Sequence, residues 1–339
     1  QSVATAVKVT GWVAAMTFSA DGGQLALAYG EPPGEDNGLT QAFHLLVLDV
    51  ARQQVTAETV LSLAPEVLAF TPNGTALMAY GVLNRDGDSI DSEPHALLLD
   101  AASLEVTWEV ALEQVRDGAT RRQSGDEEAE TVWWTPAIVL TPAQMTLYIV
   151  HADEDKLTSV NFAERAVSTI QIQAQVSWPE RLLALTAEVA YAKEMNGTSK
   201  QGVLSLDGKR LYVIGETSNT EQSEQGDAKQ IETPLGLQVI DVGTGTEITH
   251  IDTEAYRVAL SADGSRLYLQ GWTEANWMDI LDLETLEVKA RLTDRYPLHG
   301  KRLNGEAILL SEVNDPTEGK TILAVLDPQT LEELGTSVI

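Results

Sequence analysis

A short pattern that recurs along the chain constrains its fold more than any other feature. It consists of an apolar run, a Ser or Thr, a spacer that often ends in Asp-Gly or Asn-Gly, and a strand of alternating apolar residues. The clearest copies are 17–30, 69–81, 203–216 and 260–270, and weaker copies are 139–150 and 300–312. Asp-Gly and Asn-Gly in this setting indicate a β-hairpin, because a two-residue turn that matches strand twist needs positive φ at its centre. Each copy therefore predicts two antiparallel strands joined by a tight turn.

A second pattern alternates with the first. In each copy, Asp or a substitute follows an apolar strand, and a few turn residues and another strand come next. The copies are 48–55, 99–106, 160–167, 240–248, 281–288 and 326–333. Six hairpins of one kind thus alternate with six of the other, which describes a four-stranded unit repeated six times. A period of about 50 residues with four strands per repeat is typical of the blades of a β-propeller.

The two patterns together resemble those of a known group of proteins. The segments SADGSRLYL (261–269) and ILDLETLEV (280–288) are similar to the two hairpins that make each blade of the YVTN-type and WD-like bacterial β-propellers. The resemblance extends from about Phe18 to about Leu334. It implies a propeller fold, but such propellers include scaffolds, lactone hydrolases and subunits of redox enzymes, so it leaves the function open.

The sequence therefore predicts an all-β fold, a six-bladed β-propeller of four-stranded antiparallel blades in a single domain, 1–339. Residues 1–10 are expected to form a strand that closes the ring, and a seventh blade built jointly by the two ends is the alternative. The segment 180–195 has apolar residues at helical spacing, with Asn196 and Gly197 as a stop signal, so one short helical insertion is expected there. The expected blades are approximately 12–61, 66–112, 136–172, 202–252, 256–293 and 298–339.

Composition narrows the range of partners. The chain has 22 Lys and Arg against 51 Asp and Glu, a formal net charge of −29. This excess disfavours binding to nucleic acid or anionic lipid, because both depend on cationic side chains that neutralise phosphates. No apolar run is long enough to span a membrane, so we expect no transmembrane segment in this chain. The acidic, Lys-poor composition and the export of many propellers that it resembles predict an extracytoplasmic protein, whether periplasmic, secreted or surface-anchored.

The long insertions are predicted to lie on one face. In an antiparallel blade, the turns between its first and second strands and between its third and fourth strands lie on one face, and the other connections lie on the opposite face. The long segments all belong to the second class, and they are 30–41, 84–94, 113–136, 173–201 and 216–234. Loops on a rigid scaffold commonly carry binding residues, although insertions in exposed loops are also tolerated without a function.

This loop-rich face is also predicted to be acidic, since about half of the net negative charge falls in its segments. Its expected partner is therefore cationic: a basic protein surface, a polyamine or a divalent metal, with a protein as the leading candidate. The segments 117–130 and 216–230 contain few apolar residues, and we expect them to become ordered only when a partner binds. The candidate partner-binding residues are Glu35, Asp36, Glu221, Glu224, Asp227, Trp133, Trp134 and Trp272, with the tryptophans as aromatic anchors if they are exposed.

One loop has the composition of a calcium site. Asp86, Asp88, Asp91 and Glu93 place oxygen ligands at close intervals around Gly87, and calcium binds six to eight such oxygens. The spacing of an EF-hand loop is not met, and a solvated acidic loop is the alternative. No cofactor is required, and calcium is the one candidate.

The leading hypothesis for function is a non-enzymatic propeller that acts as a protein-binding scaffold or a sensor ectodomain through its acidic, loop-rich face. The alternative is a propeller enzyme, lactonase-like or similar to a redox subunit, with its site at the central channel. A calcium-stabilised adhesion module is a third hypothesis. The sequence contains no GxSxG, HxH or HExxH motif, and the expected innermost strands are mostly apolar or small, so no catalytic residue is assigned. The oligomeric state stays open.

Overall fold

The computed structural model places most of the described chain in β-strands. The residues that it describes are 11–31, 42–83, 93–122, 130–174, 194–222, 228–272, 276–293, 296–301, 307–315, 320–327, 330 and 332–338. Contacts between Cα atoms group the chain into two compact units, which we call unit 1 (1–169) and unit 2 (170–339).

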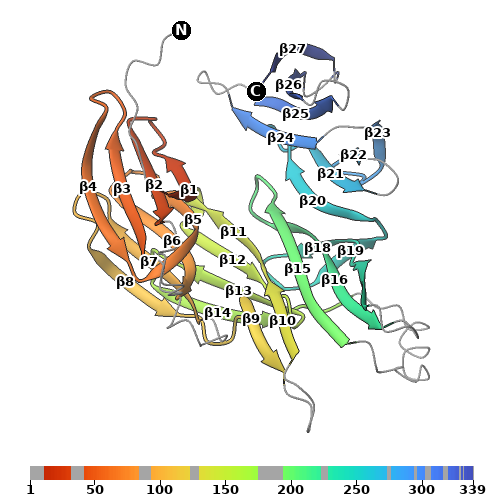
Figure 1. Ribbon diagram of the computed structural model, residues 1–339, viewed down its shortest axis with the longest axis horizontal. Helices are drawn as coiled ribbons and strands as arrows, with labels where there is room; N and C mark the ends of the chain where they lie inside the picture. The colour runs from red at the N-terminus through yellow and green to blue at the C-terminus, as the bar shows by residue number, and fades with distance from the viewer. Residues whose placement is uncertain are drawn as a thin grey trace. The chain divides into compact units, whose positions relative to one another are not determined.

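The described part of unit 1 contains three four-stranded antiparallel sheets, each with its strands in chain order (Figure 1). The first sheet consists of β1 (Trp12–Phe18), β2 (Gln24–Gly30), β3 (Phe43–Asp49) and β4 (Gln54–Leu61). The second consists of β5 (Leu63–Phe70), β6 (Ala76–Leu83), β7 (Glu93–Asp100) and β8 (Val106–Ala111). The third consists of β11 (Ala137–Thr141), the 3-10 turn η1 (Pro142–Gln144), β12 (Thr146–Val150), β13 (Lys156–Asn161) and β14 (Ala166–Gln171). In the chain, the segment that connects the second sheet to the third contains a hairpin of β9 (Gly118–Arg122) and β10 (Glu130–Thr135).

The described part of unit 2 contains two further four-stranded antiparallel sheets, and before them an antiparallel arrangement whose strands belong to a larger, seven-stranded sheet. In this first arrangement, four strands pair in chain order: β15 (Glu194–Leu204), β16 (Arg210–Gln222), β18 (Leu237–Asp241) and β19 (Glu247–Ile251). A fifth strand, β17 (Ala228–Pro234), pairs with residues Glu216–Gln222 of β16. The second consists of β20 (Ala255–Leu260), β21 (Arg266–Trp272), β22 (Asn276–Asp282) and β23 (Val288–Thr293). The third consists of β24 (Tyr296–Lys301), β25 (Ala307–Asp315), β26 (Lys320–Leu326) and β27 (Glu333–Val338).

The expected all-β fold with four-stranded antiparallel sheets is confirmed. The number of blades and the single-domain organisation stay predictions. Residues 1–10 and most of the helix expected at 180–195 lie outside the described residues. The last two residues of that segment lie in β15, and a bulge falls between Met195 and Gly197. The expected helix end is therefore wrong, because the Asn-Gly pair is accommodated within strand pairing to β16.

Four of the described turns between first and second strands share one hydrogen-bond network, and the 3-10 turn between β11 and β12 is built differently. Ser261 Oγ donates to Asp263 at 2.6 Å and accepts the backbone N–H of Arg266 at 2.9 Å. Gly264, with a φ of +70°, occupies the left-handed position that this turn requires. Equivalent side-chain pairs are Ser19–Asp21, Thr71–Asn73 and Ser205–Asp207. The network is local in sequence, and for this reason the hairpins are recognisable from the sequence alone.

The described turns between third and fourth strands are closed by an Asp, or by Asn161 in the third sheet, that accepts hydrogen bonds from its own loop. Asp282 accepts the backbone N–H of Thr285 at 2.9 Å and that of Glu284 at 3.1 Å, and these bonds, led by the one from Thr285, lower its pKa. Four residues after the Asp, Leu286 adopts a φ of +57°. The residues at this position in other sheets also have positive φ, and they are Gln53, Leu104, Arg165 and Gly245. The turn geometry is thus shared although only one of these five residues is a glycine.

The turn at Gln53 gives a test of this geometry. Gln53 is exposed and has a φ of +56°, so Gln53→Gly is expected to raise the free energy of unfolding by about 0.5 kcal/mol, because glycine adopts this conformation without strain. The control Gln54→Gly, at the first residue of β4, is expected to lower the free energy of unfolding by a similar amount. Urea unfolding followed by circular dichroism measures both changes. A loss of stability in Gln53→Gly would contradict the assigned turn.

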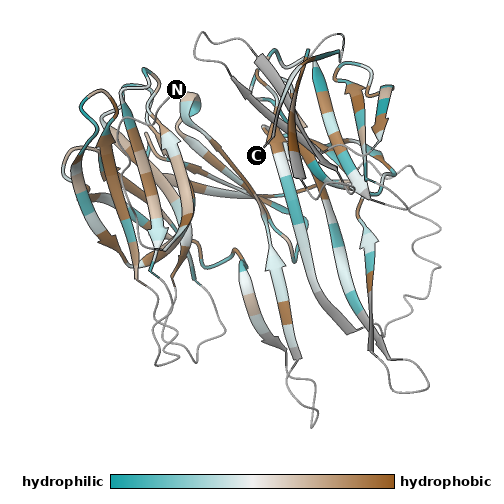
Figure 2. Cartoon of the chain, turned by 45° about the horizontal axis from the view of Figure 1, so that its top comes forward, coloured by the Kyte–Doolittle hydropathy of each residue, from teal (hydrophilic) through white to brown (hydrophobic). Residues whose placement is uncertain are grey.

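The core of unit 1 lies between its sheets. One cluster of buried side chains joins the first and second sheets and includes Leu45 and Leu77. Another cluster joins the second sheet to the third and includes Tyr80, Leu147 and Phe162, all less than 2% exposed. Hydrophobic residues accordingly run along the strands (Figure 2). Each such buried side chain contributes about 1.5–3 kcal/mol relative to exposure, so apolar packing fixes the seam between the second and third sheets.

Two polar segments differ from their expected form. The sequence predicts that 117–130 and 216–230 are ordered only with a partner, but β9, β10, β16 and β17 extend into them. For these strand residues the prediction is wrong, because cross-strand backbone pairing, such as that from Glu216 with Pro234 to Gln222 with Ala228, supports strands of low apolar content. The central residues of both segments lie outside the described ranges.

Candidate functional site

The segment 112–118 follows β8 and leads into the β9–β10 hairpin of unit 1. The backbone N–H of Leu112 donates to the carbonyl of Pro94 at 2.8 Å, and the N–H of Val115 donates to the carbonyl of Leu112 at 2.8 Å. Leu112 and Val115 are buried and belong to the cluster that joins the second and third sheets. The segment is therefore held at the seam between these two sheets, and its polar residues are presented on a fixed backbone.

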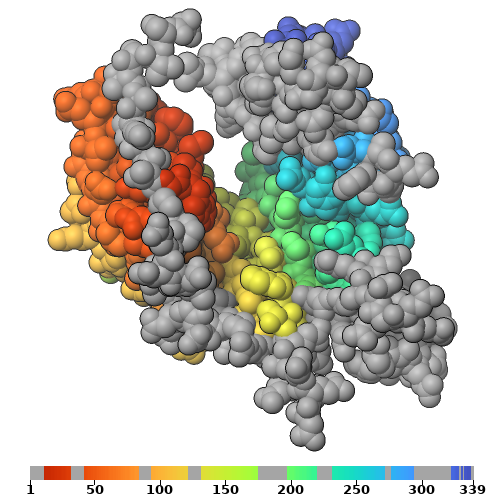
Figure 3. Space-filling view, in the orientation of Figure 1, coloured from red at the N-terminus to blue at the C-terminus, as the bar shows by residue number. Residues whose placement is uncertain are grey.

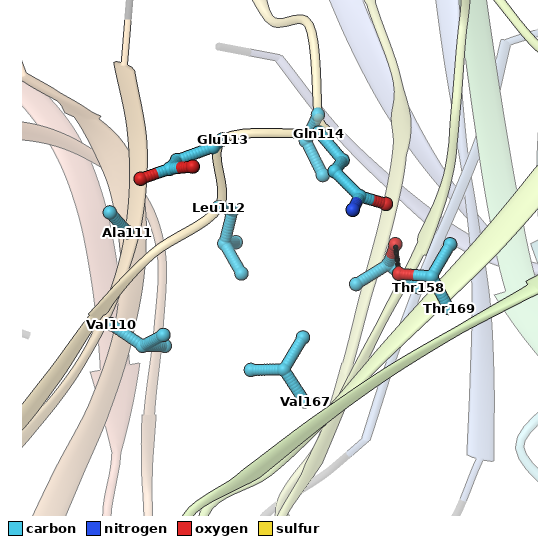
Figure 4. A pocket seen from close by; sticks show the side chains of 9 residues that line it. Val110, Ala111, Leu112, Glu113, Gln114, Thr158, Val167 and Thr169 are labelled. Carbon is cyan, nitrogen blue, oxygen red and sulfur yellow. Dashed lines mark hydrogen bonds between the residues drawn. The ribbon is translucent and has the colours of Figure 1, made fainter.

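A pocket of about 440 Å³ opens beside this segment. The end of β8 and the residues that follow it line one side, and β13 and β14 line the other (Figure 4). The polar lining consists of Glu113, Gln114, Thr158 and Thr169, and valine and leucine side chains supply most of the rest. The pocket thus combines an apolar wall with hydroxyl, amide and carboxylate groups, as small-molecule sites commonly do.

A chain of hydrogen bonds leads from this pocket into the interior of the third sheet. The hydroxyls of Thr169 and Thr158 share a hydrogen bond of 2.8 Å (Figure 4). Thr158 Oγ1 also lies 2.7 Å from Nε2 of His151, whose side chain is fully buried. Nδ1 of His151 lies 4.0 Å from Oδ1 of Asp153, and Arg116 Nε lies 3.2 Å from Oδ2 of the same carboxylate. The tautomer of His151 decides the direction of the bond to Thr158, which donates when Nε2 is unprotonated and accepts when Nε2 carries the proton.

Sequence analysis did not single out Thr158, although the repeat contains a signal for it. Thr158 stands three residues before Asn161, the turn residue of the third sheet. The same position is Leu46 in the first sheet and Leu97 in the second, and both are buried. A hydroxyl in place of a buried leucine indicates a local requirement beyond packing, because a buried polar group must find a partner.

Asp117 belongs to a second polar cluster. Tyr80 donates its hydroxyl to Asp117 Oδ2 at 2.6 Å, and both side chains are buried. The pairing of β5 with β6 shifts at Glu66, which stands next to the partner of Tyr80 in the register. Burial raises the pKa of Asp117 to about 6, and burial together with the charge of Asp117 raises the pKa of Glu66 to about 8. Two carboxyls with separated pKa values let one hold a proton at neutral pH while the other is ionised.

The same cluster makes stability depend on pH. Between its ordinary pKa of 4.5 and its folded-state pKa of about 8, Glu66 binds more protons in the folded protein than in the unfolded chain, so the free energy of unfolding falls as pH rises through this window. Much of the Glu66 surface is open to solvent although protein atoms crowd its carboxyl group, so screening by solvent limits the size of the effect. Glu66→Gln is expected to reduce the decrease in the free energy of unfolding with pH. The control Glu105→Gln, at an exposed turn, is expected to show the same decrease as wild type. Urea unfolding from about pH 5 to about pH 9 measures the slope, and equal slopes in wild type and Glu66→Gln would contradict this assignment.

The described residues that were predicted to bind a partner differ in exposure. Trp133 on β10 is 61% exposed, and its hairpin forms part of the face seen in Figure 3, where it is yellow. Trp134 is buried, and its Nε1 donates to Thr120 Oγ1 on β9 at 2.9 Å. Neighbouring residues of a strand face opposite ways, so Trp134 anchors the hairpin and Trp133 is presented to solvent. Glu221 lies in β16 and Trp272 in β21. The others lie outside the described residues, and they are Glu35, Asp36, Glu224 and Asp227.

The calcium site stays a prediction. Glu93 begins β7, where its carboxylate lies 3.8 Å from Nε2 of His95. Asp86, Asp88 and Asp91 lie outside the described residues. Within the ranges that the structure describes, no three His, Asp or Glu side chains are grouped as a bound metal ion would need.

Among the described residues, no helix is both long and apolar enough to cross a membrane.

Unit 2 carries an extension that we call the acidic ribbon, residues 216–222 of β16 and 228–234 of β17. Seven residue pairs join its two strands. Burial and the charge of Glu232 raise the pKa of Glu216, which is half-buried. The sequence from 216 to 234 contains five acidic residues and a single Lys. The two glutamates thus repel each other within an excess of negative charge, and a cationic group placed against them would relieve that repulsion.

The solved structures most similar to this chain include several β-propellers. Hydrazine synthase of Kuenenia stuttgartiensis is 16% identical, and the match covers 96% of this chain and 80% of that one, with a TM-score of 0.51. The Dos1 propeller is 11% identical over 96% of this chain and 73% of that one, with a TM-score of 0.52. The β-propeller domain of Cps50 (Swd1) from Myceliophteria thermophila is 11% identical over 99% and 89%, with a TM-score of 0.52.

These likenesses show the fold, and the chain has a β-propeller fold built of four-stranded antiparallel sheets. At such low identity they show nothing of the activity, and membership of the YVTN type stays a prediction. No family model matches the sequence, and no curated protein matches it.

Proposed function

We propose that this protein is a non-enzymatic propeller that binds a partner protein with a basic surface, as a scaffold or a sensor ectodomain. The acidic ribbon of unit 2 is the observation that carries this proposal. Within its described strands, the negative charge of Glu232 and burial raise the pKa of Glu216, and no cationic side chain lowers that pKa. A Lys or Arg of a partner supplies the missing positive charge, and complementary charges of this kind increase both association rate and specificity.

The location that we propose is outside the cytoplasm. The support is the acidic, Lys-poor composition, with a formal net charge of −29, and the resemblance to exported propellers. The same charge disfavours nucleic acid as a partner, because each phosphate contact needs a cationic side chain.

Matched charge variants test the role of the ribbon. The double variant Glu216→Gln/Glu232→Gln removes two negative charges from the ribbon, and the control Glu254→Gln/Glu284→Gln removes two exposed charges elsewhere in unit 2. A partner crosslinked from the native envelope or secreted fraction is purified, and its affinity for each variant is measured. We expect the ribbon variant to bind about five- to tenfold more weakly and the control to bind like wild type. Equal affinities for the ribbon variant and wild type would refute the proposal.

A second candidate function is an enzyme of the lactonase-like type, and the pair Glu66 and Asp117 is the observation that favours it. Their pKa values of about 8 and about 6 suit a general acid and a general base near neutral pH. Hydrolysis of a simple lactone, followed at constant pH by titration, tests this candidate. Activity that Glu66→Gln abolishes and Glu105→Gln retains would support it, and wild-type protein without activity would remove it.

A further inference from the structure

We propose that the outer edge of β17 in the acidic ribbon binds an extended segment of the partner as an added β-strand, with a Lys or Arg of that segment opposite Glu232. This inference rests on the proposed function, because it names how a basic partner contacts the ribbon. Among the described strands, β16 pairs with β15 on one side and with β17 on the other, and β17 pairs with β16 alone. With respect to these strands the second edge of β17 is unpaired, and such an edge is a template for strand addition.

The pairing register determines which backbone groups of β17 point outward. In an antiparallel pair, alternate residues exchange their N–H and C=O with the neighbouring strand, and the residues between them direct these groups to the other side. Leu235 and Gly215 continue the register of the ribbon, and the N–H of Leu235 donates to the carbonyl of Gly215 at 2.8 Å. Thr233, two residues earlier, therefore also bonds to β16. The N–H and C=O of Gln230 and Glu232 face the outer edge of β17.

A proline at the end of β17 fits this orientation. Pro234 occupies the next outward position after Glu232. Proline has no N–H, and within sheets it is found where that group would face away from the neighbouring strand. An added strand thus finds both a donor and an acceptor at Gln230 and at Glu232, but only an acceptor at Pro234. The added strand is therefore expected to pair mainly with the residues before Pro234.

The side chains on one face of the ribbon determine the charge of the added strand. Residues directly opposite each other in a sheet share a face, and Glu216 lies opposite Pro234 while Ser218 lies opposite Glu232. Glu216 and Glu232 are therefore on the same face, where Glu232 is exposed and Glu216 is half-buried. A residue opposite Glu232 in the added strand shares this face, with about 5.5 Å or less between the two Cβ atoms. A Lys or Arg there attracts both glutamates, and an Asp or Glu repels them.

Four capped heptapeptides test the proposal. The reference peptide alternates Thr and Lys, and the second peptide has Glu in place of each Lys. The third carries an N-methyl group on the backbone nitrogen of every Lys, and the fourth carries one on that of every Thr. When a Lys lies opposite Glu232, the lysines bond to β17 through their own backbone and the threonines direct theirs away. Methylation of the lysines therefore removes the bonding N–H groups, methylation of the threonines keeps them, and both peptides keep the charge.

Backbone amide NMR signals of Gln230 and Glu232 are followed while the whole protein is titrated. We expect saturable shifts with the reference and the Thr-methylated peptide, at least about fivefold weaker binding of the Lys-methylated peptide, and at least about tenfold weaker binding of the Glu peptide. No saturable shift with the reference peptide would overturn the proposal. Equal binding of the Lys-methylated peptide would overturn strand addition and leave the basic partner standing, because charge alone would then suffice. Equal binding of the Glu peptide would overturn both.

Two variants test the same edge from the side of the protein. Gln230→Pro removes one outward N–H and no bond to β16, so it is expected to weaken binding of the reference peptide at least about fivefold. Gln230→Thr keeps the N–H and is expected to bind like wild type. Equal affinities of Gln230→Pro and wild type would contradict the assigned edge, and thermal unfolding confirms that both variants are folded. A dimer in sedimentation that Gln230→Pro dissociates would place a second copy of this chain on the edge and overturn the proposal.

Discussion

Gly81→Ala is expected to lower the free energy of unfolding by about 3 kcal/mol or more, enough to unfold much of unit 1. Gly81 lies in β6 and pairs with Pro65 in β5. A Cβ atom at Gly81 would lie 2.1 Å from the carbonyl oxygen of Ala64 and 2.7 Å from Cδ1 of Leu63. The nearest obstacle is backbone in a paired strand, so the sheet cannot yield without losing hydrogen bonds. Close approach of two strands, rather than turn geometry, thus requires glycine here.

A strand glycine with open surroundings provides the control for this substitution. Gly335 lies in β27, and a Cβ atom there would meet no other heavy atom within 4 Å. Gly335→Ala is expected to keep or slightly raise the free energy of unfolding. Urea unfolding of both variants, followed by circular dichroism, measures the difference. If Gly81→Ala has the same free energy of unfolding as Gly335→Ala, then β5 and β6 are further apart than the structure has them.

Arg291→Ala is expected to lower the free energy of unfolding by about 2 kcal/mol. Asp279 is only 5% exposed, and Arg291 Nε and Nη2 donate to its two oxygens at 2.5 and 2.7 Å. The guanidinium also lies 4.6 Å from the ring centroid of Trp277. Removing Arg291 leaves a buried carboxylate without its partner, which costs about 3–5 kcal/mol for a fully buried pair and less here, because the Arg291 side chain is 56% exposed.

Removing the carboxylate as well is expected to restore most of this loss. Asp279 occupies the position that Leu46 and Leu97 fill in the first and second sheets, three residues before the turn Asp. Asp279→Leu/Arg291→Ala therefore replaces a buried charge with the side chain that the repeat accommodates elsewhere. Chemical unfolding of the single and double variants compares them directly. A double variant less stable than Arg291→Ala alone would show that the carboxylate is stabilised by more than this arginine.

The parts of the fold that were predictable from sequence are those whose causes are local. The Ser261–Asp263 hydrogen bond, the positive φ of Gly264 and the Asp282 cap all lie within a few residues of one another, so the sequence pattern contains the whole interaction. The acidic ribbon was mistaken for a loop because its strands are supported by pairing between β16 and β17 rather than by apolar periodicity.

The candidate sites were less predictable because their residues meet only after folding. His151 and Thr158 are seven residues apart and become neighbours through the connection from β12 to β13. Tyr80 and Asp117 come from different elements, 37 residues apart. For Thr158 the sequence offered only a weak signal, a polar residue at a repeat position that is leucine in the first and second sheets, and for Asp117, in a linking segment, it offered none. Trp133 and Trp134 could be named as a pair, but which of them is exposed depends on the face that β10 buries.

The most direct test of the partner-binding proposal is carbodiimide crosslinking, which joins carboxylates to lysines that touch them, followed by mass spectrometry of the captured complex. The account predicts that partner lysines link to carboxylates between residues 216 and 234, and that Glu216→Gln/Glu232→Gln loses these links at Glu216 and Glu232 and weakens capture. Links confined to other acidic positions, such as Glu254 or Glu284, would contradict it, because the partner would then bind without contacting the acidic ribbon.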